Sequence, residues 1–510
     1  MAFDARRVAA AVLVMVTAGA LRTGAQEPTP PSATPSPTPA PAAAAPSPET
    51  LAGTFRDNFE FRTADGANTL RIGASFHLDG RVFFGDSEAP TSFDIRRARV
   101  DFRGRLRGWM SYRVQISLEN EPYIRNLWLD LGFSDPLHLR VGQMKVPFST
   151  SWVTLDNQVN FVERATEAPV YPFFDRGVML WGMLADSRLV YQLGAYNGSG
   201  LDLDTQKGDV DDHKDVALRL FAQPFRGSGS DALQGLYFVA QGTYGPQSVA
   251  TKRFESGGLS TPSYESRVWR WRLEQTIGTN GRSTDSITAE IGSRTRWGLE
   301  AHWLYGPLTV SSEYLVLSYD DISISHQYLQ GSNRLLSEPQ LERSGDVRSA
   351  TLWASWFLTG ERKTVDTFGW RQPSPKSELR PGSGGTGAWE LLARLSRTTS
   401  DRALFDTVAV RGYTAAELAD VGAVPVGEGE SVRAAVLDGA AEVVEATLGA
   451  NWTLNPNLRI QLNLVHLWVP DPEVNGGLLS AANSDLGDPA LRNVKVDSET
   501  SALARLIFRF

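Results

Sequence analysis

From about Thr69 to the C-terminus, apolar and polar residues alternate along the chain with a period of two. The first such segment, residues 69–84, reads TLRIGASFHLDGRVFF, so one face is largely apolar and the other carries arginine, histidine and aspartate. A period of two predicts β-strands and not helices. Because such segments are about ten residues long and one face is charged, we expect one face to meet lipid and the other to meet water.

Sixteen segments show this pattern, and most of the connections between them alternate in length. Short connections such as 134–136 and 455–457 alternate with long ones such as 245–293, as in a barrel with turns on one side of a membrane and loops on the other. Two connections break the alternation, because 119–123 is short on the loop side and 359–387 is long on the turn side. The pattern predicts an all-β, transmembrane antiparallel β-barrel of about sixteen strands, within about two. The expected strands lie near 69–84, 93–103, 109–118, 124–133, 137–145, 177–185, 188–197, 214–223, 235–244, 294–305, 307–318, 348–358, 388–397, 442–454, 458–469 and 501–510.

The N-terminus has the composition of an export signal. Arg6 and Arg7 precede the apolar run Val8–Ala20, and small residues up to Ala25 suit cleavage. This run is shorter than the ~20 residues of a membrane-spanning helix; the alternative is a soluble N-terminal helix. The following Pro-, Ala-, Ser- and Thr-rich stretch is expected to be an extended tether, or alternatively a segment that binds peptidoglycan or a partner. The predicted organisation is a signal peptide at 1–25, a Pro/Ala-rich disordered linker at 26–54 and an outer-membrane β-barrel domain at 55–510.

Composition narrows the class of protein further. The 510 residues include no cysteine, which excludes disulfides, thiolate metal sites and a lipoprotein anchor. A mean hydropathy of −0.23 argues against a helical membrane protein, whereas a barrel keeps its average low through alternation. The net charge is −8, and removal of residues 1–25, with three arginines and one aspartate, leaves about −10. This acidity argues against nucleic acid as a partner.

Aromatic residues lie where the strands are expected to end. Rings with a polar edge favour the boundary between headgroups and hydrocarbon; the alternative is the core of a soluble β-sandwich, which would not explain the long polar faces. The last strand places Leu506, Phe508 and Phe510 on one face, which resembles the C-terminal assembly signal of bacterial outer-membrane proteins. The aromatic residues near strand ends are Trp109, Trp128, Trp297, Trp303, Tyr305, Trp389, Trp452 and Trp468.

An ordered set of sequence blocks over roughly residues 55–510 resembles the phosphate-selective porin O and P family. The resemblance implies a sixteen-stranded barrel, a homotrimer and anion-selective diffusion. The family's phosphate-specific members line their constriction with arginines and lysines, whereas the long loops of this chain offer no lysine cluster. The resemblance therefore implies anion preference and leaves phosphate specificity open. The blocks are FRTADG at 61–66, IRRAR at 95–99, LRVGQMKVPF at 139–148, FVER at 161–164, DRGV at 175–178, GAYNG at 194–198, FLTGE at 357–361 and GAWE at 387–390.

The strongest candidates for function are arginines on the first three expected strands. Alternation turns them toward the lumen, against Asp79 and Asp101. An arginine is always charged and presents a planar fork of donors that suits phosphate oxygens, so a row of them would attract anions and pass them along. The alternative is that they pair with lumen acids and stiffen the wall. The candidate anion-pathway residues are Arg71, Arg81, Arg97, Arg99, Arg103 and Arg113.

The connection 146–176 is the loop most suited to fold into the pore, because loops of this length usually have a function. Lys145 and Arg164 are the candidate constriction residues, opposed by nearby acids; the alternative is a lid on the surface.

Enzyme functions find no support in the sequence. The six histidines are scattered without metal-ligand spacing, and we identify no catalytic residue, metal site or cofactor. The function predicted is a porin of the bacterial outer membrane that passes small anions, phosphate or polyphosphate among them. The alternative is a structural or adhesive barrel with a plugged or non-selective lumen. The expected partners are small anions, outer-membrane lipid, the barrel assembly machinery and two further copies of the chain.

Overall fold

The computed structural model describes most of the chain beyond residue 50. The predicted signal peptide and the linker up to residue 50 lie outside the described residues. Residues 51–54, which the sequence analysis assigns to the linker, form a strand instead. The described residues are 51–55, 58–85, 90–119, 122–166, 170–198, 212–246, 258–263, 266–271, 274–279, 283–338, 340–382, 384–411, 413–420, 432–479 and 495–510.

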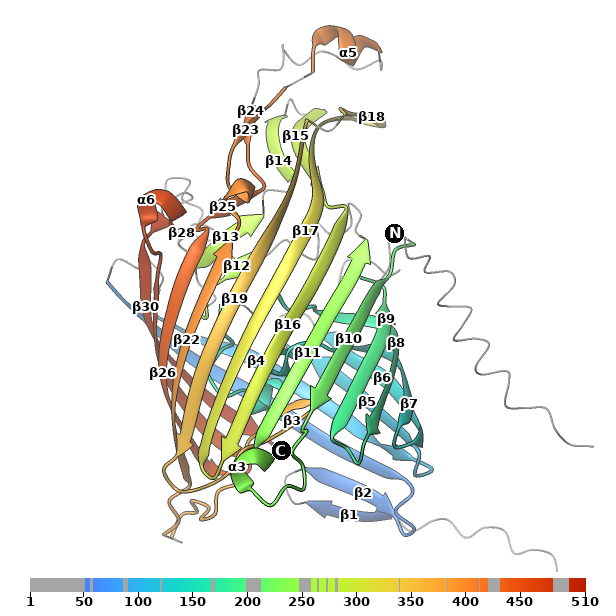
Figure 1. Ribbon diagram of the computed structural model, residues 1–510, viewed down its shortest axis with the longest axis vertical. Coiled ribbons are helices and arrows are strands. Elements are labelled where there is room, and N and C mark those ends of the chain that lie inside the picture. Colours follow the sequence, from blue (N-terminus) through green and yellow to red (C-terminus); the bar gives the residue numbers. More distant parts are fainter. Residues whose placement is uncertain are drawn as a thin grey trace, which may run out of the picture. The chain divides into compact units, whose positions relative to one another are not determined.

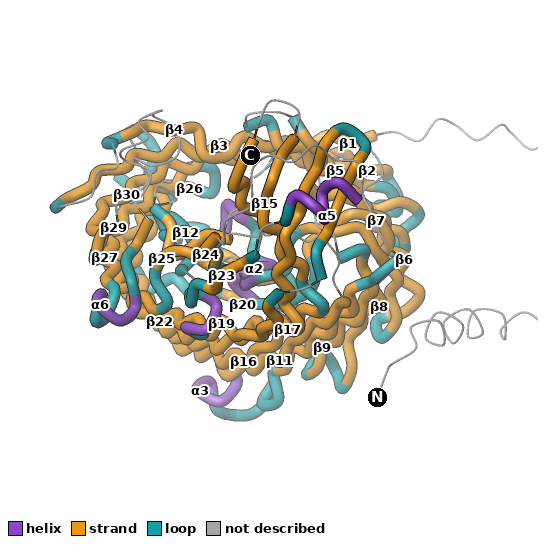
Figure 2. The backbone as a smooth tube through the Cα atoms, turned by 90° about the horizontal axis from the view of Figure 1, so that it is seen from above, coloured by secondary structure: helices purple, strands orange, loops and turns teal. Residues whose placement is uncertain are grey.

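Sixteen antiparallel strands form a closed ring (Figures 1 and 2). Each strand pairs with the next along the ring, and the last, β30, pairs with the first, β3, from Ser75↔Arg509 to Phe84↔Thr500. All sixteen segments expected from the alternation appear, so the predicted strand number is confirmed. The ring consists of β3 (Thr69–Phe84), β4 (Ser92–Leu106), β5 (Met110–Ser117), β6 (Tyr123–Ser134), β7 (Leu137–Lys145), β8 (Phe174–Leu184), β9 (Leu189–Tyr196), β10 (Asp215–Ala222), β11 (Leu236–Pro246), β16 (Ser293–Tyr305), β17 (Leu308–Gln330), β19 (Leu341–Phe357), β22 (Ala388–Ser400), β26 (Glu442–Asn455), β27 (Leu458–Trp468) and β30 (Ser498–Arg509).

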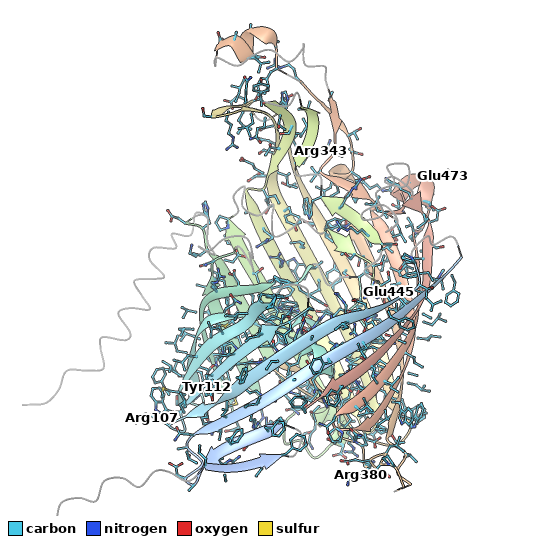
Figure 3. All side chains as sticks on the ribbon, turned by 180° about the vertical axis from the view of Figure 1, so that it is seen from behind. Arg107, Tyr112, Arg343, Arg380, Glu445 and Glu473 are labelled. Carbon is cyan, nitrogen blue, oxygen red and sulfur yellow. The ribbon has the colours of Figure 1, made fainter. Side chains whose placement is uncertain are left out.

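The two ends of the ring differ in their connections. Figure 3 shows Arg107 and Arg380 at the end with mostly short turns, here called the short-turn end, and Arg343 and Glu473 at the opposite, long-loop end. The β4–β5 turn is tight because Arg107 and Gly108 adopt positive φ angles of 51° and 78°. In outer-membrane barrels the short turns face the periplasm.

The C-terminal strand closes the seam of the ring at the short-turn end. The Phe510 backbone N–H donates to the Ala74 carbonyl at 3.1 Å, and the Phe510 carbonyl accepts from the Ala74 N–H at 3.0 Å. The Phe508 and Phe76 rings stack on the outer surface at 6.3 Å. The assembly role of Leu506, Phe508 and Phe510 stays a prediction.

A hairpin precedes the ring. Its strands are β1 (Leu51–Phe55) and β2 (Phe59–Thr63), and β2 pairs with the first four residues of β3 at the short-turn end. Because β30 ends beside Ser75, the hairpin occupies the stretch of β3 that β30 leaves uncovered.

Parts of two chain segments lie inside the ring, where Figure 2 shows α2 and β20. Segment 146–173, between β7 and β8, contains α2 (Thr150–Val153) and the 3-10 helix η1 (Asp156–Gln158). Segment 359–387, between β19 and β22, contains the hairpin of β20 (Thr364–Asp366) and β21 (Gly369–Arg371). The second segment is the turn whose length broke the sequence pattern, so its length is explained by a fold into the lumen.

The remaining elements belong to the connections. Buried apolar residues of one small sheet, including Trp269 and Leu437, form a core with Tyr171 of segment 146–173. No helix among the described residues is long and apolar enough to cross a membrane. The other strands and helices are β12 (Leu259–Ser260), β13 (Arg267–Trp271), β25 (Leu437–Gly439), β28 (Leu478–Leu479) and β29 (Lys495–Val496) of that sheet, then β14 (Glu274–Thr279), β15 (Ser283–Glu290), β18 (Asn333–Leu336), β23 (Val408–Val410), β24 (Val432–Ala434), α3 (Asp231–Gln234), η3 (Arg402–Leu404), α5 (Ala415–Asp420) and α6 (Pro472–Asn475).

Candidate functional site

A cavity of about 810 Å³ lies inside the ring toward the short-turn end, against the inner faces of β3 to β9. Nine basic side chains and three acidic ones line it, so positive charge dominates its wall. We call this space the arginine cavity. Its basic residues are Arg71, Arg99, Arg103, Arg105, Arg113, Arg140, Lys145, Arg371 and Arg509, and its acidic residues are Asp101, Asp130 and Asp156.

Three arginines stand in one row across adjacent strands of this wall. Arg71 on β3 is the register partner of Arg103 on β4, and Arg103 is the partner of Arg113 on β5. Like charges directly opposite one another destabilise a sheet unless something offsets them. Asp101 offsets Arg113, with Oδ2 2.6 Å from Nη2. The Arg103 side chain has no hydrogen bond or ion pair among the described residues, so this row keeps an uncompensated charge.

The inner end of the arginine cavity is formed by segment 146–173. Asp156 of this segment accepts from Arg164 Nη2 at 3.1 Å, lies 3.8 Å from Arg125 Nη2 and contacts Arg99. Lys145 donates to the carbonyl oxygens of Trp152 and Thr154 at 2.7 and 2.8 Å. The structure thus brings both predicted constriction residues, Lys145 and Arg164, to the same end of the cavity as Arg99. Lys145 uses its donors to hold the segment.

A second carboxylate of the same segment, Glu163, is held by three wall arginines. Arg97 binds it through two parallel hydrogen bonds of 3.0 and 2.9 Å, Arg505 at 2.5 Å and Arg96 at 3.1 Å. Burial alone would raise the pKa of Glu163, but Arg97, Arg505 and Arg96 hold it well below the ordinary value. The segment is therefore attached to the arginine-bearing wall through charged groups.

The six predicted arginines separate into two groups. Arg71, Arg99, Arg103 and Arg113 line the arginine cavity. Arg97 is buried against Glu163, and Arg81 pairs with Asp94 at 3.4 Å and Asp79 at 3.8 Å, so neither lines that cavity.

The opposite half of the lumen is filled by protein. Segment 146–173 is held there by wall acceptors on three strands: Glu300 accepts from the Thr150 N–H at 2.9 Å, Glu445 from the Thr166 N–H at 3.0 Å, and Asn463 from the Val162 N–H at 2.6 Å. We call this part of the lumen, lined by β10, β16, β17, β19, β22, β26 and β27, the packed half.

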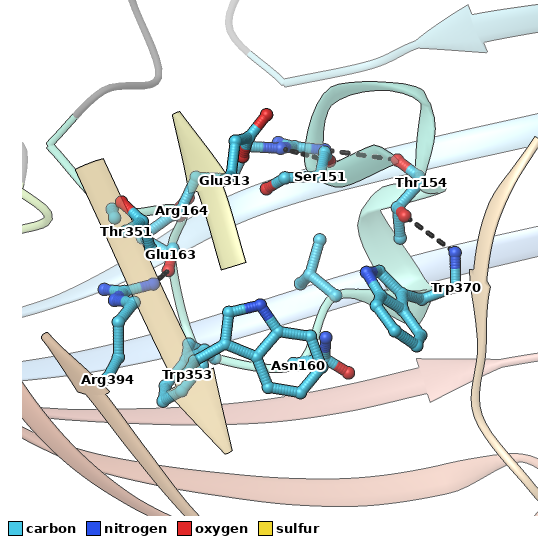
Figure 4. Close-up of a pocket in the computed structure, with 13 residues that line it drawn as sticks. Ser151, Thr154, Asn160, Glu163, Arg164, Glu313, Thr351, Trp353, Trp370 and Arg394 are labelled. Atoms are coloured by element: carbon cyan, nitrogen blue, oxygen red, sulfur yellow. Dashed lines mark hydrogen bonds between the residues drawn. The ribbon is translucent and has the colours of Figure 1, made fainter. Parts of the chain in front are cut away.

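Segment 359–387 completes the packed half. The Trp370 N–H donates to Thr154 Oγ1 at 2.8 Å, and the Trp370 ring lies 5.0 Å from that of Trp353 and 5.0 Å from that of His302. A cavity of only about 40 Å³, shown in Figure 4, adjoins these tryptophans. Lys363 contacts Glu390, and burial lowers the pKa of Lys363 while Glu390 offsets part of this effect. This half is closed by apolar packing and by paired charges.

Sequence reasoning missed several residues that matter here. Arg96 should face away from the lumen by alternation, but a register shift opposite His77 and Leu78 brings it to Glu163. Arg505 lies on β30, which pairs with β3 in the closed ring. It binds Glu163 of segment 146–173, which lies far away in the sequence. Arg140, held by Asp130 at 2.7 Å and lying over the Trp128 ring at 4.1 Å, follows the alternation and could have been found by it.

Comparison with known proteins gives one family and several loose structural likenesses. The solved structures include an anion-selective porin from Comamonas acidovorans (TM-score 0.45, 10% identity, 87% of this chain and 100% of that chain). They also include OmpT from Vibrio cholerae (0.44, 10%, 87% and 98%) and the outer membrane channel DcaP of Acinetobacter baumannii (0.41, 9%, 88% and 99%). No curated protein matches the sequence. The family model for phosphate-selective porin O and P matches residues 68–475. The chain therefore belongs to the phosphate-selective porin O and P family and is a β-barrel porin of the bacterial outer membrane.

Proposed function

We propose that this porin is a channel for the passive diffusion of small anions and that the arginine cavity forms its periplasmic part. Family membership and the barrel indicate a channel rather than an enzyme. The observation that carries the anion preference is the lining of the arginine cavity, in which basic residues outnumber acidic ones by nine to three.

The arrangement of the charges supports a stepwise path. In a confined site the effective dielectric lies below that of bulk water, so each arginine attracts an anion more strongly than it would at the surface. An anion from the periplasm first meets the row of Arg71, Arg103 and Arg113, and then the group around Asp156. Arginine forks suit the oxygens of phosphate as well as they attract chloride, so inorganic phosphate belongs to the proposed substrates.

Assembly follows from family membership as a further part of this proposal. The porin is expected to form a homotrimer and to be inserted by the barrel assembly machinery, which would recognise Leu506, Phe508 and Phe510. The outer face of the barrel supports contact with lipid, because large apolar side chains such as Trp356, Leu395 and Leu448 are 57%, 53% and 63% exposed there.

The second candidate function is a structural barrel with a plugged lumen. It is favoured by the two segments that occupy the packed half, 146–173 and 359–387. Single-channel recording in a planar bilayer separates the candidates, because a channel conducts and a plugged barrel scarcely does.

The test of selectivity is a double variant of the two cavity arginines whose side chains make no ion pair in the described structure. Arg103→Glu with Arg105→Glu lowers the surplus of basic over acidic lining residues from six to two. In a low-salt KCl gradient the wild type should prefer chloride, and the variant should lose at least about threefold of the chloride-to-potassium permeability ratio. The matched control is Arg362→Glu with Arg380→Glu, two exposed arginines outside the cavity lining.

Each of the two experiments has an outcome that would contradict the proposed anion channel. Equal reversal potentials for wild type and the double variant would show that the cavity arginines do not set selectivity. Absence of conductance in a folded, membrane-inserted wild type would favour the plugged barrel.

A further inference from the structure

The hairpin of β1 and β2 belongs to the wall of the channel mouth. Its strand β2 adds to β3 through four register pairs, Phe59↔Ile72 to Arg62↔Thr69, on the stretch of β3 that β30 leaves free. Its outer face is anchored by aromatic contacts, because the Phe59 ring lies 5.9 Å edge-on to that of Phe510. Asn58, just before β2, lines the arginine cavity. The hairpin thus extends the cavity wall toward the periplasm.

The inner face of this hairpin carries one carboxylate toward the arginine row. Glu60 is the register partner of Arg71, which continues the row of Arg103 and Arg113 by one strand. Glu60 Oε2 accepts from Arg71 Nε at 2.6 Å, and Oε1 accepts from Arg62 Nη2 at 2.5 Å. The side chain of Glu60 is 17% exposed and that of Arg71 is 45% exposed. Glu60 therefore holds a cavity arginine that an anion can still reach.

The ionisation of Glu60 supports a lasting charge at this place. The hydrogen bond from Arg62 lowers the pKa of Glu60, burial acts against it, and Arg71 lowers it further. The carboxylate is charged at neutral pH and occupies the Nε donor of Arg71, which would otherwise be open to an anion. Each end arginine of the row is consequently bound by an acid, Arg71 by Glu60 and Arg113 by Asp101, which lies beside Arg103 on β4.

We propose that Glu60 sets how strongly the mouth of the channel holds an oxyanion, by competing with it for Arg71. This inference rests on the proposed function and names a residue that tunes it. Conduction requires that an anion bind well enough to enter and weakly enough to leave. A row of three arginines without the competing carboxylate would hold phosphate longer. Glu60 therefore lowers the affinity of the mouth for phosphate and speeds the exchange of phosphate with the periplasm.

The experiment uses Glu60→Gln in the full-length porin, with inorganic phosphate as the probe added to the periplasmic side of a bilayer. The dwell time of phosphate block should lengthen by about three- to tenfold, as expected for removal of one nearby charge in a confined site. The matched control is Glu378→Gln, which removes a carboxylate that binds Arg380 at 2.6 Å outside the cavity lining. It should leave the dwell time unchanged.

A double-mutant cycle shows whether Glu60 acts through Arg71. Arg71→Gln should shorten the dwell time, and Glu60→Gln should then add little in the Arg71→Gln background. An unchanged or shorter dwell time in Glu60→Gln, with a folded barrel on a heat-modifiability gel, would overturn the proposal. So would an equal effect of Glu60→Gln with and without Arg71. Failure of the anion channel itself is recognised separately, because the wild type would then show no chloride preference.

Discussion

The two halves of the lumen are built from strands of the same period but close the barrel by different means. Against the arginine-bearing wall of β3 to β9 the chain leaves a cavity of about 810 Å³, and segment 146–173 touches that wall through Asp156 and Glu163. In the packed half the inward side chains meet two lumen segments through backbone hydrogen bonds and tryptophan packing. Alternation therefore decides which side chains face inward, whereas the connections decide which of them meet water.

The energetic consequences of the two designs differ. Ion pairs between arginine and carboxylate are directional and depend on charge. Removing one partner of a buried pair destabilises the protein, because it leaves the other charge uncompensated. Aromatic packing responds to volume, since a deleted ring leaves a cavity. Charge changes should therefore alter ion preference mainly on the arginine-bearing side, where charged side chains line the cavity. Volume changes should act mainly in the packed half, where the charged groups are paired and buried.

The largest effect is expected from reversing the charges that hold the loop. Arg97→Glu with Arg99→Glu replaces the partners of Glu163 and Asp156 by carboxylates, so the loop is repelled and the wall changes by four charges. The wild type should prefer chloride over potassium, and the double variant should lose or reverse that preference in a low-salt KCl gradient.

Ionic strength sharpens this test. The difference should shrink at high salt, because the Debye length falls to about 3 Å at 1 M. If the two proteins gave the same reversal potential at low salt, Arg97 and Arg99 would only stiffen the barrel wall. The charges on the arginine-bearing side would then not control ion preference.

A smaller effect of another kind is expected from the packed half. Trp370→Ala removes a ring that is 2% exposed and adjoins the cavity of about 40 Å³, so it should open space beside segment 146–173. Single-channel conductance should rise by up to about twofold, with little change in ion preference, because the lost side chain is uncharged. Trp389→Ala, a tryptophan that is 39% exposed on the outer face, is the control and should leave conductance unchanged. If Trp370→Ala changed ion preference but not conductance, the packed half would not act through its volume, as proposed here.

Much of the fold could be predicted because a lipid-facing strand must keep its period of two along its whole length. The same rule turned Arg71, Arg103 and Arg113 inward. It could not find Arg96, because a local register shift moves this residue to the other face. It also could not show that Arg164 and Arg99 meet at Asp156, or that Lys145 binds the loop backbone, because both depend on how a loop folds back across the lumen. The length of 359–387 was visible as an exception, but only contacts such as that of Trp370 with Thr154 show where the segment goes.

The smallest expected effect is the change of conductance with pH that depends on Glu163. It tests directly how the ion pairs of Glu163 attach the loop to the wall. Arg97, Arg505 and Arg96 outweigh burial and hold the pKa of Glu163 well below 4.5. A carboxyl whose pKa is lower in the folded protein stabilises the folded state at every pH above its ordinary value, and this stabilisation is lost only as the pH falls through the lowered value. The loop should therefore stay attached, and the conductance of the wild type should stay constant, between pH 7 and about 5. Only when the pH falls through the lowered pKa of Glu163, well below 4.5, does protonation weaken its contacts with the arginines, and the conductance should rise there. Glu163→Gln removes the titrating group, so its conductance should already be raised at pH 7 and should not rise further in acid. Glu378→Gln should behave as the wild type. An acid step of equal size in Glu163→Gln would mean that another group attaches the loop to the arginine-bearing wall.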